Sequence, residues 1–296
     1  MNKETELHMN RNYKDTLFRM IFSNKTELLS LYNAIKGTEY HDPDVLKIVT
    51  LENAIYMNMK NDLAFLIDDT LNLYEHQSTF SPNMPLRNLF YIAKEYEKSI
   101  SKNTLYSSKA IPLSTPDFYV FYNGTEKDWD RKEFKLSDVY KKKTKDPKLE
   151  LCVTMININY GKNEELFEQC HTLWEYMMYV EKVRRYSETT EINQAVERAV
   201  TESIEENILR EFLTRCRAEA VQMSIFEYDE ERELKLIRED EREIGREEGL
   251  EKGLEALIRC NLEDNISEER ILQNLQKYFF LNLEEAKEKF LKVTAK

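Results

Sequence analysis

The segment from Asn61 to Gln77, NDLAFLIDDTLNLYEHQ, constrains the fold of this chain more than any other part of the sequence. Apolar residues alternate with other residues before and after Asp68-Asp69-Thr70, and such an acidic, threonine-containing triplet favours a turn. The pattern therefore predicts two antiparallel strands, 62–67 and 71–78, joined by a loop of two or three residues.

The predicted hairpin brings acidic side chains together. It places Asp62 opposite His76 or Gln77, and it places Glu75 and Gln77 on one face because side chains two apart share a face. The diagonal to Asp62 is about 7–8 Å, so two carboxylates can reach one ion. Oxygen ligands of this kind suit Mg²⁺ or Mn²⁺ rather than zinc, and such an ion activates water and offsets charge on a phosphate. The alternative is that Asp62 is a turn or cap residue and that 75–77 is a solvated strand face.

Composition limits the classes of protein that the chain can belong to. With 296 residues and 41% hydrophobic content it can bury one substantial core and carry an appended unit. We expect no membrane segment, because no apolar run of about eighteen residues occurs, and no secretory signal, because the start MNKETELHMN is polar. Four separate cysteines without a C-x-x-C pair argue against a zinc ribbon and a disulfide framework. A reduced, cytoplasmic protein is expected.

Net charge opposes a nucleic-acid partner, but its distribution weakens the objection. The chain carries −12, yet residues 201–296 hold 25 acidic and 16 basic side chains, whereas the first 200 residues hold 30 and 27. Clusters at 131–132, 141–145 and 184–185 offer phosphate contacts, or else they are solvated loop and helix ends. Charge by itself neither supports nor excludes DNA.

Hydrophobic periodicity predicts an α/β fold. A strand, helix, strand order between residues 71 and 123 requires a right-handed crossover and hence a mixed sheet with helices on both faces. In the first predicted helix, Asp15, Phe18 and Phe22 share one face. The expected helices are 13–22, 24–37 and 86–99, and the further expected strands are 54–60, 118–123 and 149–159.

From residue 191 onward the sequence is almost entirely helical in pattern. We expect a core at 1–190, a long amphipathic helical segment at 191–240, and a charged helical tail at 241–296 that ends in two short amphipathic helices. Glycines recur every four residues in IGREEGLEKGLE, at 245, 249 and 253. The spacing can form a groove for a helix of a second subunit, which predicts a homo-oligomer, a dimer, through the tail. The alternative is a mobile linker.

The stretch MNMKNDLAFLIDDTLNLYEHQSTFSPNMPLRNLFYIAKEY resembles the core of the Rpn family, the recombination-promoting nucleases and transposase-like proteins of the PD-(D/E)XK nuclease superfamily. The resemblance extends to KDTLFRMIF, STPDFYVFYNG, FKLSDVY and LELCVTMININYG and covers about residues 12–230. It implies a restriction-endonuclease-like mixed sheet flanked by helices, with an all-helical C-terminal extension. It also implies a Mg²⁺- or Mn²⁺-dependent DNA endonuclease.

The resemblance assigns roles to individual residues. Asp62 corresponds to the first acid of the superfamily, Glu75 to the second, and Gln77 to the position usually held by lysine. Asp15 corresponds to an acid from the first helix, and the backbone carbonyl of His76 is a further predicted metal ligand. Gln77 departs from the superfamily pattern but agrees with the Glu-x-Gln form of Rpn proteins. Its amide can hold the attacking water, although it supplies no positive charge.

Four basic residues are the predicted nucleic-acid contacts: Arg87, Lys141, Lys142 and Lys143. Arg87 shares a helix face with Tyr91 and follows the hairpin closely, so it either binds phosphate or pairs with a neighbouring acid. The imidazole of His76 should project from the opposite face of its strand.

Two functional classes remain open, and they differ in whether the chain binds a metal ion. In the first, the protein is a metal-dependent DNA endonuclease. In the second, it is an inactive interaction module that keeps a nuclease-like shape and assembles through its tail. A third, weaker possibility is a protein that binds nucleic acid without cutting it. Carboxylates of Asp62 and Glu75 more than about 8 Å apart would favour the module.

Overall fold

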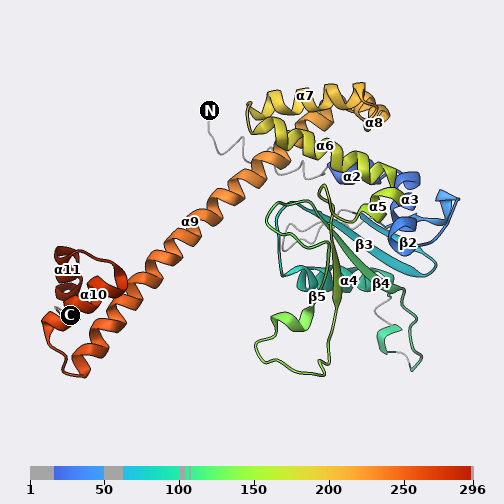
Figure 1. Cartoon of the computed structure of the whole chain (residues 1–296). Coiled ribbons are helices and arrows are strands. Elements are labelled where there is room, and N and C mark those ends of the chain that lie inside the picture. Colours follow the sequence, from blue (N-terminus) through green and yellow to red (C-terminus); the bar gives the residue numbers. More distant parts are fainter. Residues whose placement is uncertain (1–16, 50–62, 101–103, 107, 295–296) are drawn as a thin grey trace, which may run out of the picture. The chain divides into compact units, whose positions relative to one another are not determined.

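The computed structural model describes residues 17–49, 63–100, 104–106 and 108–294 (Figure 1). The predicted ligands Asp15 and Asp62 and the predicted strand 54–60 lie outside these residues. The chain divides into two compact units, the first ending at Glu231 and the second beginning at Arg232. This division differs from the expected limits after residues 190 and 240, because the helices that follow residue 190 pack against the first core.

The first unit is built on a six-stranded mixed sheet, as far as the described residues show, which confirms the predicted α/β class. The strand order is β1-β2-β3-β4-β6-β5. The first three strands are antiparallel, β3, β4 and β6 are parallel, and β5 returns antiparallel to β6. Their bounds are β1 Lys47–Ile48, β2 Leu63–Ile67, β3 Thr70–Gln77, β4 Thr115–Tyr122, β5 Arg131–Lys135 and β6 Cys152–Asn157.

The predicted hairpin is present as β2 and β3, but its register differs from the expected one. Asp68 and Asp69 form a two-residue loop, and both have a positive φ, 47° and 55°. This loop conformation matches the twist of the strands and pairs the flanking residues directly. Leu63 therefore pairs with Tyr74. The predicted register paired it with residue 75 or 76, so that prediction was wrong by one or two positions.

Helices cover both faces of the sheet (Figure 1). Helix α4, Met84–Ser99, covers one face and makes the crossover between β3 and β4. On the other side of the sheet, further helices of this unit share one hydrophobic core. These are α2 Leu17–Phe22, α3 Lys25–Lys36, α5 Glu164–Gln169, α6 His171–Ser187, α7 Ile192–Glu205 and α8 Arg210–Arg215.

Two hydrophobic cores follow from this layering. One lies between the sheet and α2, α3 and α5–α8, and the other lies between the sheet and α4. Strand β3 contributes to both cores because its side chains alternate: Tyr74 enters the first core, and Leu71 and Leu73 enter the second. Capping residues lie at both ends of α3. Asn24 caps its start by accepting a hydrogen bond from the Thr26 amide, and Gly37, with φ 65°, ends it.

Helix α9, Arg217–Glu263, is continuous through the three regularly spaced glycines. In the second unit, its later residues pack with α10, Glu268–Phe279, and α11, Leu283–Thr294, so the two predicted terminal helices are confirmed. A methyl group at Gly253 would meet the Phe279 ring at 3.6 Å, whereas at Gly245 and Gly249 it would meet no described atom within 4 Å.

Two expectations from composition can be compared with the structure. All four cysteines are free thiols, in agreement with the absence of a disulfide framework. Within the described part of the chain, none of the helices has both the length and the apolar composition that crossing a bilayer demands.

Candidate active site

Glu75 and Gln77 project from the same face of β3, near its carboxyl end, and both contact helix α4. An Nη2 proton of Arg87 is donated to Glu75 Oε1, and Gln77 Nε2 donates to Met84 Sδ at 3.0 Å. Glu75 is 3% exposed. The predicted shared face is therefore confirmed, and the candidate site lies between the end of β3 and the start of α4.

The Arg87 guanidinium pairs with the buried Glu75 carboxylate rather than standing apart from it. Its Nη2 also approaches the Tyr91 hydroxyl at 3.4 Å, so the predicted shared face of Arg87 and Tyr91 is confirmed. The Arg87 side chain is 29% exposed, whereas that of Glu75 is 4% exposed. The Arg87 side chain is thus partly accessible to solvent, whereas the Glu75 side chain is not.

The amide oxygen of Gln77 distinguishes this site from an ordinary structural ion pair. Oε1 is buried and accepts no hydrogen bond from any of the described residues. Buried polar atoms in folded proteins usually have a partner, which can be a protein group, an ordered water or an ion. The Glu75 carboxylate and this Gln77 amide oxygen therefore lie two residues apart on one strand face, and both are ligand types that Mg²⁺ accepts.

The predicted metal ligands are only partly covered by the described residues. No group of three or more His, Cys, Asp or Glu side chains suited to a metal ion occurs among the described residues, which exclude Asp15 and Asp62. Asp62 directly precedes Leu63 in the sequence, and Leu63 pairs with Tyr74, the residue before Glu75. The described oxygen donors fit a hard divalent ion in kind. They require at least one further acid to complete its ligand set.

The imidazole of His76 lies on the opposite face of β3, as the alternation predicts. Its ring stacks on Phe18 with centroids 5.1 Å apart, and Nε2 is hydrogen-bonded to the Tyr176 hydroxyl at 2.9 Å. Burial lowers the pKa of His76 to about 3, with a smaller contribution from the positive charge of Arg184. The imidazole is neutral at pH 7 and supports the core. The peptide unit of His76 pairs with Phe121 in the β3–β4 ladder.

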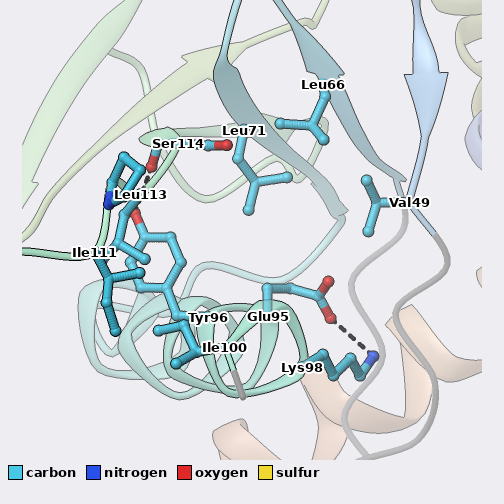
Figure 2. Close-up of a pocket in the computed structure, with 11 residues that line it drawn as sticks. Val49, Leu66, Leu71, Glu95, Tyr96, Lys98, Ile100, Ile111, Leu113 and Ser114 are labelled. Carbon is cyan, nitrogen blue, oxygen red and sulfur yellow. Dashed lines mark hydrogen bonds and ion pairs between the residues drawn. The ribbon is translucent and has the colours of Figure 1, made fainter. Parts of the chain in front are cut away.

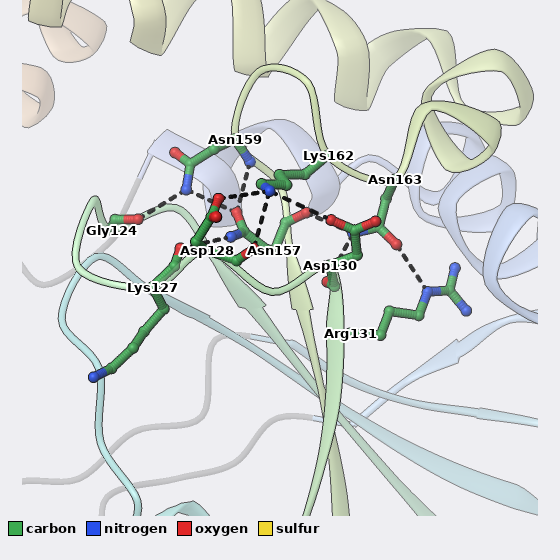
Figure 3. Close-up of polar contacts among 9 residues, drawn as sticks. All are labelled: Gly124, Lys127, Asp128, Asp130, Arg131, Asn157, Asn159, Lys162 and Asn163. Atoms are coloured by element: carbon green, nitrogen blue, oxygen red, sulfur yellow. Dashed lines mark hydrogen bonds and ion pairs between the residues drawn. The ribbon is translucent and has the colours of Figure 1, made fainter.

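Asparagine side chains fix the loops at the carboxyl edge of the sheet (Figure 3). Asn157 Nδ2, Asn159 Nδ2 and Asn163 Nδ2 donate to backbone carbonyls of the segment 124–130 at 3.1, 2.8 and 2.8 Å. Gly124 is required here, because a Cβ at this position would lie 2.0 Å from the carbonyl oxygen of Ser78. The loops beside the end of β3 are therefore held by side-chain bonds in addition to the sheet.

Basic side chains also gather at this carboxyl edge. Arg131 Nε donates to Asn163 at 3.1 Å, Lys162 pairs with Asp128 at 2.7 Å, and Arg184 Nη1 donates to Asn159 at 2.8 Å. The sequence had indicated Arg131 and Arg184 as members of basic clusters but gave no sign that they meet at one edge. It missed Lys162, whose only local signal is its position just after the apolar strand β6.

The predicted nucleic-acid contacts Lys141, Lys142 and Lys143 follow the end of β5 that lies away from Glu75 and Gln77. They are exposed and follow β5, which runs antiparallel to β6. Lys135 at the end of β5 pairs with the start of β6, whereas Gln77 aligns through Tyr122 with the end of β6. Their partners on β6, Cys152 and Asn157, are five residues apart, or about 17 Å along the strand.

Helix α4 carries a second buried acid near its other end, Glu95, which serves as a comparison for Glu75. Its carboxylate pairs with Lys98 Nζ at 2.8 Å beside a pocket of about 380 Å³ (Figure 2). The pocket is mainly apolar, with Leu66 and Leu71 on the strand side, and the Tyr96 hydroxyl donates to a backbone carbonyl at 2.7 Å. Glu95 thus has the burial and the positive partner of Glu75 but not the neighbouring amide oxygen.

Comparison of the chain with protein-family models, with curated proteins and with solved structures found no match. The described residues define an α/β protein with a mixed sheet and with a buried carboxylate, an arginine and an amide at the carboxyl end of one strand. The resemblance to Rpn nucleases stays a prediction from the sequence.

Proposed function

We propose that this protein is a metal-dependent DNA endonuclease of the Rpn type, with a PD-(D/E)XK nuclease fold. One observation carries the proposal. Glu75 and Gln77 converge on one face at the end of β3, and the buried Gln77 oxygen accepts no hydrogen bond from the described residues. An arrangement of this kind suits a site that receives a further group, because proteins rarely leave such atoms without a partner.

Each residue then has a distinct role in phosphodiester hydrolysis. Bound Mg²⁺ or Mn²⁺ supplies charge stabilisation and lowers the pKa of water. Asp62, Glu75 and the His76 carbonyl are the proposed ligands, Asp15 is an accessory acid, and Gln77 orients the attacking water through its amide. Arg87, which is partly exposed, contacts a phosphate oxygen, because its planar guanidinium can bind two oxygens at once.

Metal-dependent plasmid nicking by the purified chain tests the proposal. We expect nicking with Mg²⁺ or Mn²⁺, none with chelator, and a loss of at least about 100-fold in Asp62→Ala and Glu75→Gln. Glu95→Gln is the matched control, since it neutralises a similarly buried, paired acid that lies on α4 rather than on β3, and it should nick as wild type does. Equal nicking by all four proteins would identify a contaminant and contradict the proposal.

Gln77→Lys probes the position of Gln77 directly. A lysine there restores the residue type that the superfamily resemblance places at this position, and it can both orient water and offset phosphate charge. We expect activity to be retained. If the variant loses nicking activity while its circular dichroism spectrum is unchanged, the proposed water-orienting role of Gln77 is contradicted.

A second candidate function is an inactive interaction module, and the Arg87–Glu75 pair favours it. The Arg87 guanidinium offsets the negative charge of the Glu75 carboxylate without any metal ion. Such a module would assemble through α9, where Leu236, Ile237 and Ile244 are each about half exposed. Light scattering of the wild type and of an Ile237→Glu/Ile244→Glu variant tests assembly. We expect a dimer that the variant converts to a monomer, and a monomer in both cases would remove this function.

A further inference from the structure

A pocket of about 470 Å³ opens on the outer side of α5 and α6, in the first unit. It plays no part in the proposed nuclease chemistry. Its volume falls within the range of about 300–1,000 Å³ that is usual for small-molecule sites. Eight residues line it: Tyr160, Gly161, Glu164, Phe167, Glu168, His171, Trp174 and Met177.

The walls of this pocket are aromatic. Phe167 is buried at its base, Trp174 is half-buried, and Tyr160 is 69% exposed at its rim. The His171 ring stacks on Trp174 with centroids 5.2 Å apart and an interplanar angle of 16°. Aromatic faces carry negative electrostatic potential and attract cations.

The charged side chains of the pocket are both acidic. Glu164 and Glu168 are exposed and lie four residues apart on α5, so they share one side of that helix. Among the described residues that line the pocket, none is a lysine or an arginine. The nearby Lys162 is engaged by Asp128 at 2.7 Å. The pocket therefore attracts cations and repels phosphate.

The rim of the pocket is held in place by the surrounding structure. Gly161 has φ 74°, a left-handed conformation that turns the chain directly after Tyr160. Asn159 and Asn163, on either side of this turn, are both fixed by the hydrogen bonds of the carboxyl-edge loops (Figure 3). Helix α5 ends and helix α6 begins at Cys170, and residues of both helices line the same pocket.

We propose that this pocket binds an alkylated ammonium group. A trimethylammonium group combines a diffuse positive charge with an apolar surface, and aromatic faces next to carboxylates recognise both features. A primary ammonium is more strongly hydrated and gains less from aromatic walls. The Met177 thioether adds a polarisable apolar contact at the base.

Calorimetric titration with choline, and with its neutral isostere 3,3-dimethylbutan-1-ol, tests the charge requirement. We expect choline to bind at least about tenfold more tightly, which corresponds to about 1.4 kcal/mol. A third titration uses N-acetyl-trimethyllysine amide. Binding of this amide at least tenfold tighter than choline assigns the pocket to a modified protein side chain, and equal or weaker binding assigns it to a free small cation. Equal binding of choline and the isostere, or no heat with any of the ligands, overturns the proposal.

Substitutions on α5 and α6 test whether choline binds in this pocket. Glu168→Gln and Trp174→Leu should each weaken choline binding at least about fivefold, because each removes one attraction to the cation. Glu165→Gln is the matched control, since Glu165 is exposed on the same helix but does not line the pocket. Equal affinity in Glu165→Gln and Glu168→Gln would contradict the assignment. Circular dichroism verifies that each variant is folded, and nicking activity should be unchanged in all three.

Discussion

Glu75 and His76 are adjacent in the sequence, yet the two faces of β3 handle their titratable groups in opposite ways. On one face, His76 is neutral, stacked on Phe18 and hydrogen-bonded to Tyr176. On the other, the Glu75 carboxylate is buried against a partly exposed arginine. The comparison shows that a single strand can contribute to an aromatic core on one side and to a buried ion pair on the other.

The difference arises from the elements that pack on each face. The rings of Phe18 and Tyr176 contact His76, Phe121 packs against Phe18, and burial is the main cause of the lowered pKa of His76. The α4 face instead receives Arg87 from the crossover helix. The first face is therefore expected to respond to mutation as a close-packed core, and the second as a charge pair. Four predictions test this contrast, in order of decreasing effect.

Removing the ring that supports His76 should have the largest effect. Phe18 is fully buried and lies 5.0–5.6 Å, between ring centroids, from three aromatic neighbours on this face. We expect Phe18→Ala to reduce the free energy of unfolding by about 3–5 kcal/mol, through lost burial and an unfilled cavity. Urea denaturation followed by circular dichroism measures it. Phe280→Ala, at a side chain 90% exposed, is the control and should change stability by less than about 0.5 kcal/mol. A loss below about 1 kcal/mol for Phe18→Ala would refute close packing on this face.

Replacing Arg87 should leave the buried Glu75 carboxylate without its positive partner. We expect Arg87→Met to cost about 3 kcal/mol, because breaking a buried ion pair leaves one charge without its counter-ion. The double variant Arg87→Met/Glu75→Gln should recover most of this loss, and a double-mutant cycle measures the coupling. Lys98→Met is the matched control, at a more exposed lysine that also pairs with a buried acid. If Arg87→Met alone proves neutral, Glu75 is not a buried charge in solution.

The neutral His76 predicts a dependence of stability on pH. Its folded pKa, about 3, is below the ordinary value of 6.5, so the unfolded chain binds the proton first as the pH falls. The stabilising contribution is complete above pH 6.5 and is lost at up to about 1.4 kcal/mol per pH unit on going toward pH 4. Urea titrations at several pH values, compared with His76→Gln, separate this slope from that of the carboxylates. Parallel slopes in the two proteins would show that His76 is not held neutral.

Removing the Tyr176 hydroxyl should have the smallest effect. It bonds to His76 Nε2 at 2.9 Å and accepts from Asn123 Nδ2 at 3.3 Å. We expect Tyr176→Phe to cost about 1–2 kcal/mol, since the ring remains and only the hydrogen bonds are lost. Tyr106→Phe, at a side chain 92% exposed, controls for loss of a hydroxyl and should be silent in the same denaturation assay. A cost above that of Phe18→Ala would reverse the proposed order of contributions.

Local patterns in the sequence were sufficient to predict several elements. The alternation around Asp68-Asp69 predicted the hairpin, and the asparagine and glycine that flank α3 marked its ends. No strand was predicted at β5, because its residues RKEFK expose four charged side chains and bury only Phe134. Edge strands of this kind lack the apolar alternation on which prediction depends.

The amino-acid sequence by itself determined which face of β3 each side chain takes, because alternation is a property of the extended backbone. Alternation therefore places Glu75 and Gln77 on one face of β3 and His76 on the other. Only the tertiary structure decided what each side chain meets: Arg87 for Glu75, and Phe18 with Tyr176 for His76. These partners come from other elements, and contacts of that kind depend on the crossover, the register and the packing of whole helices rather than on any local pattern.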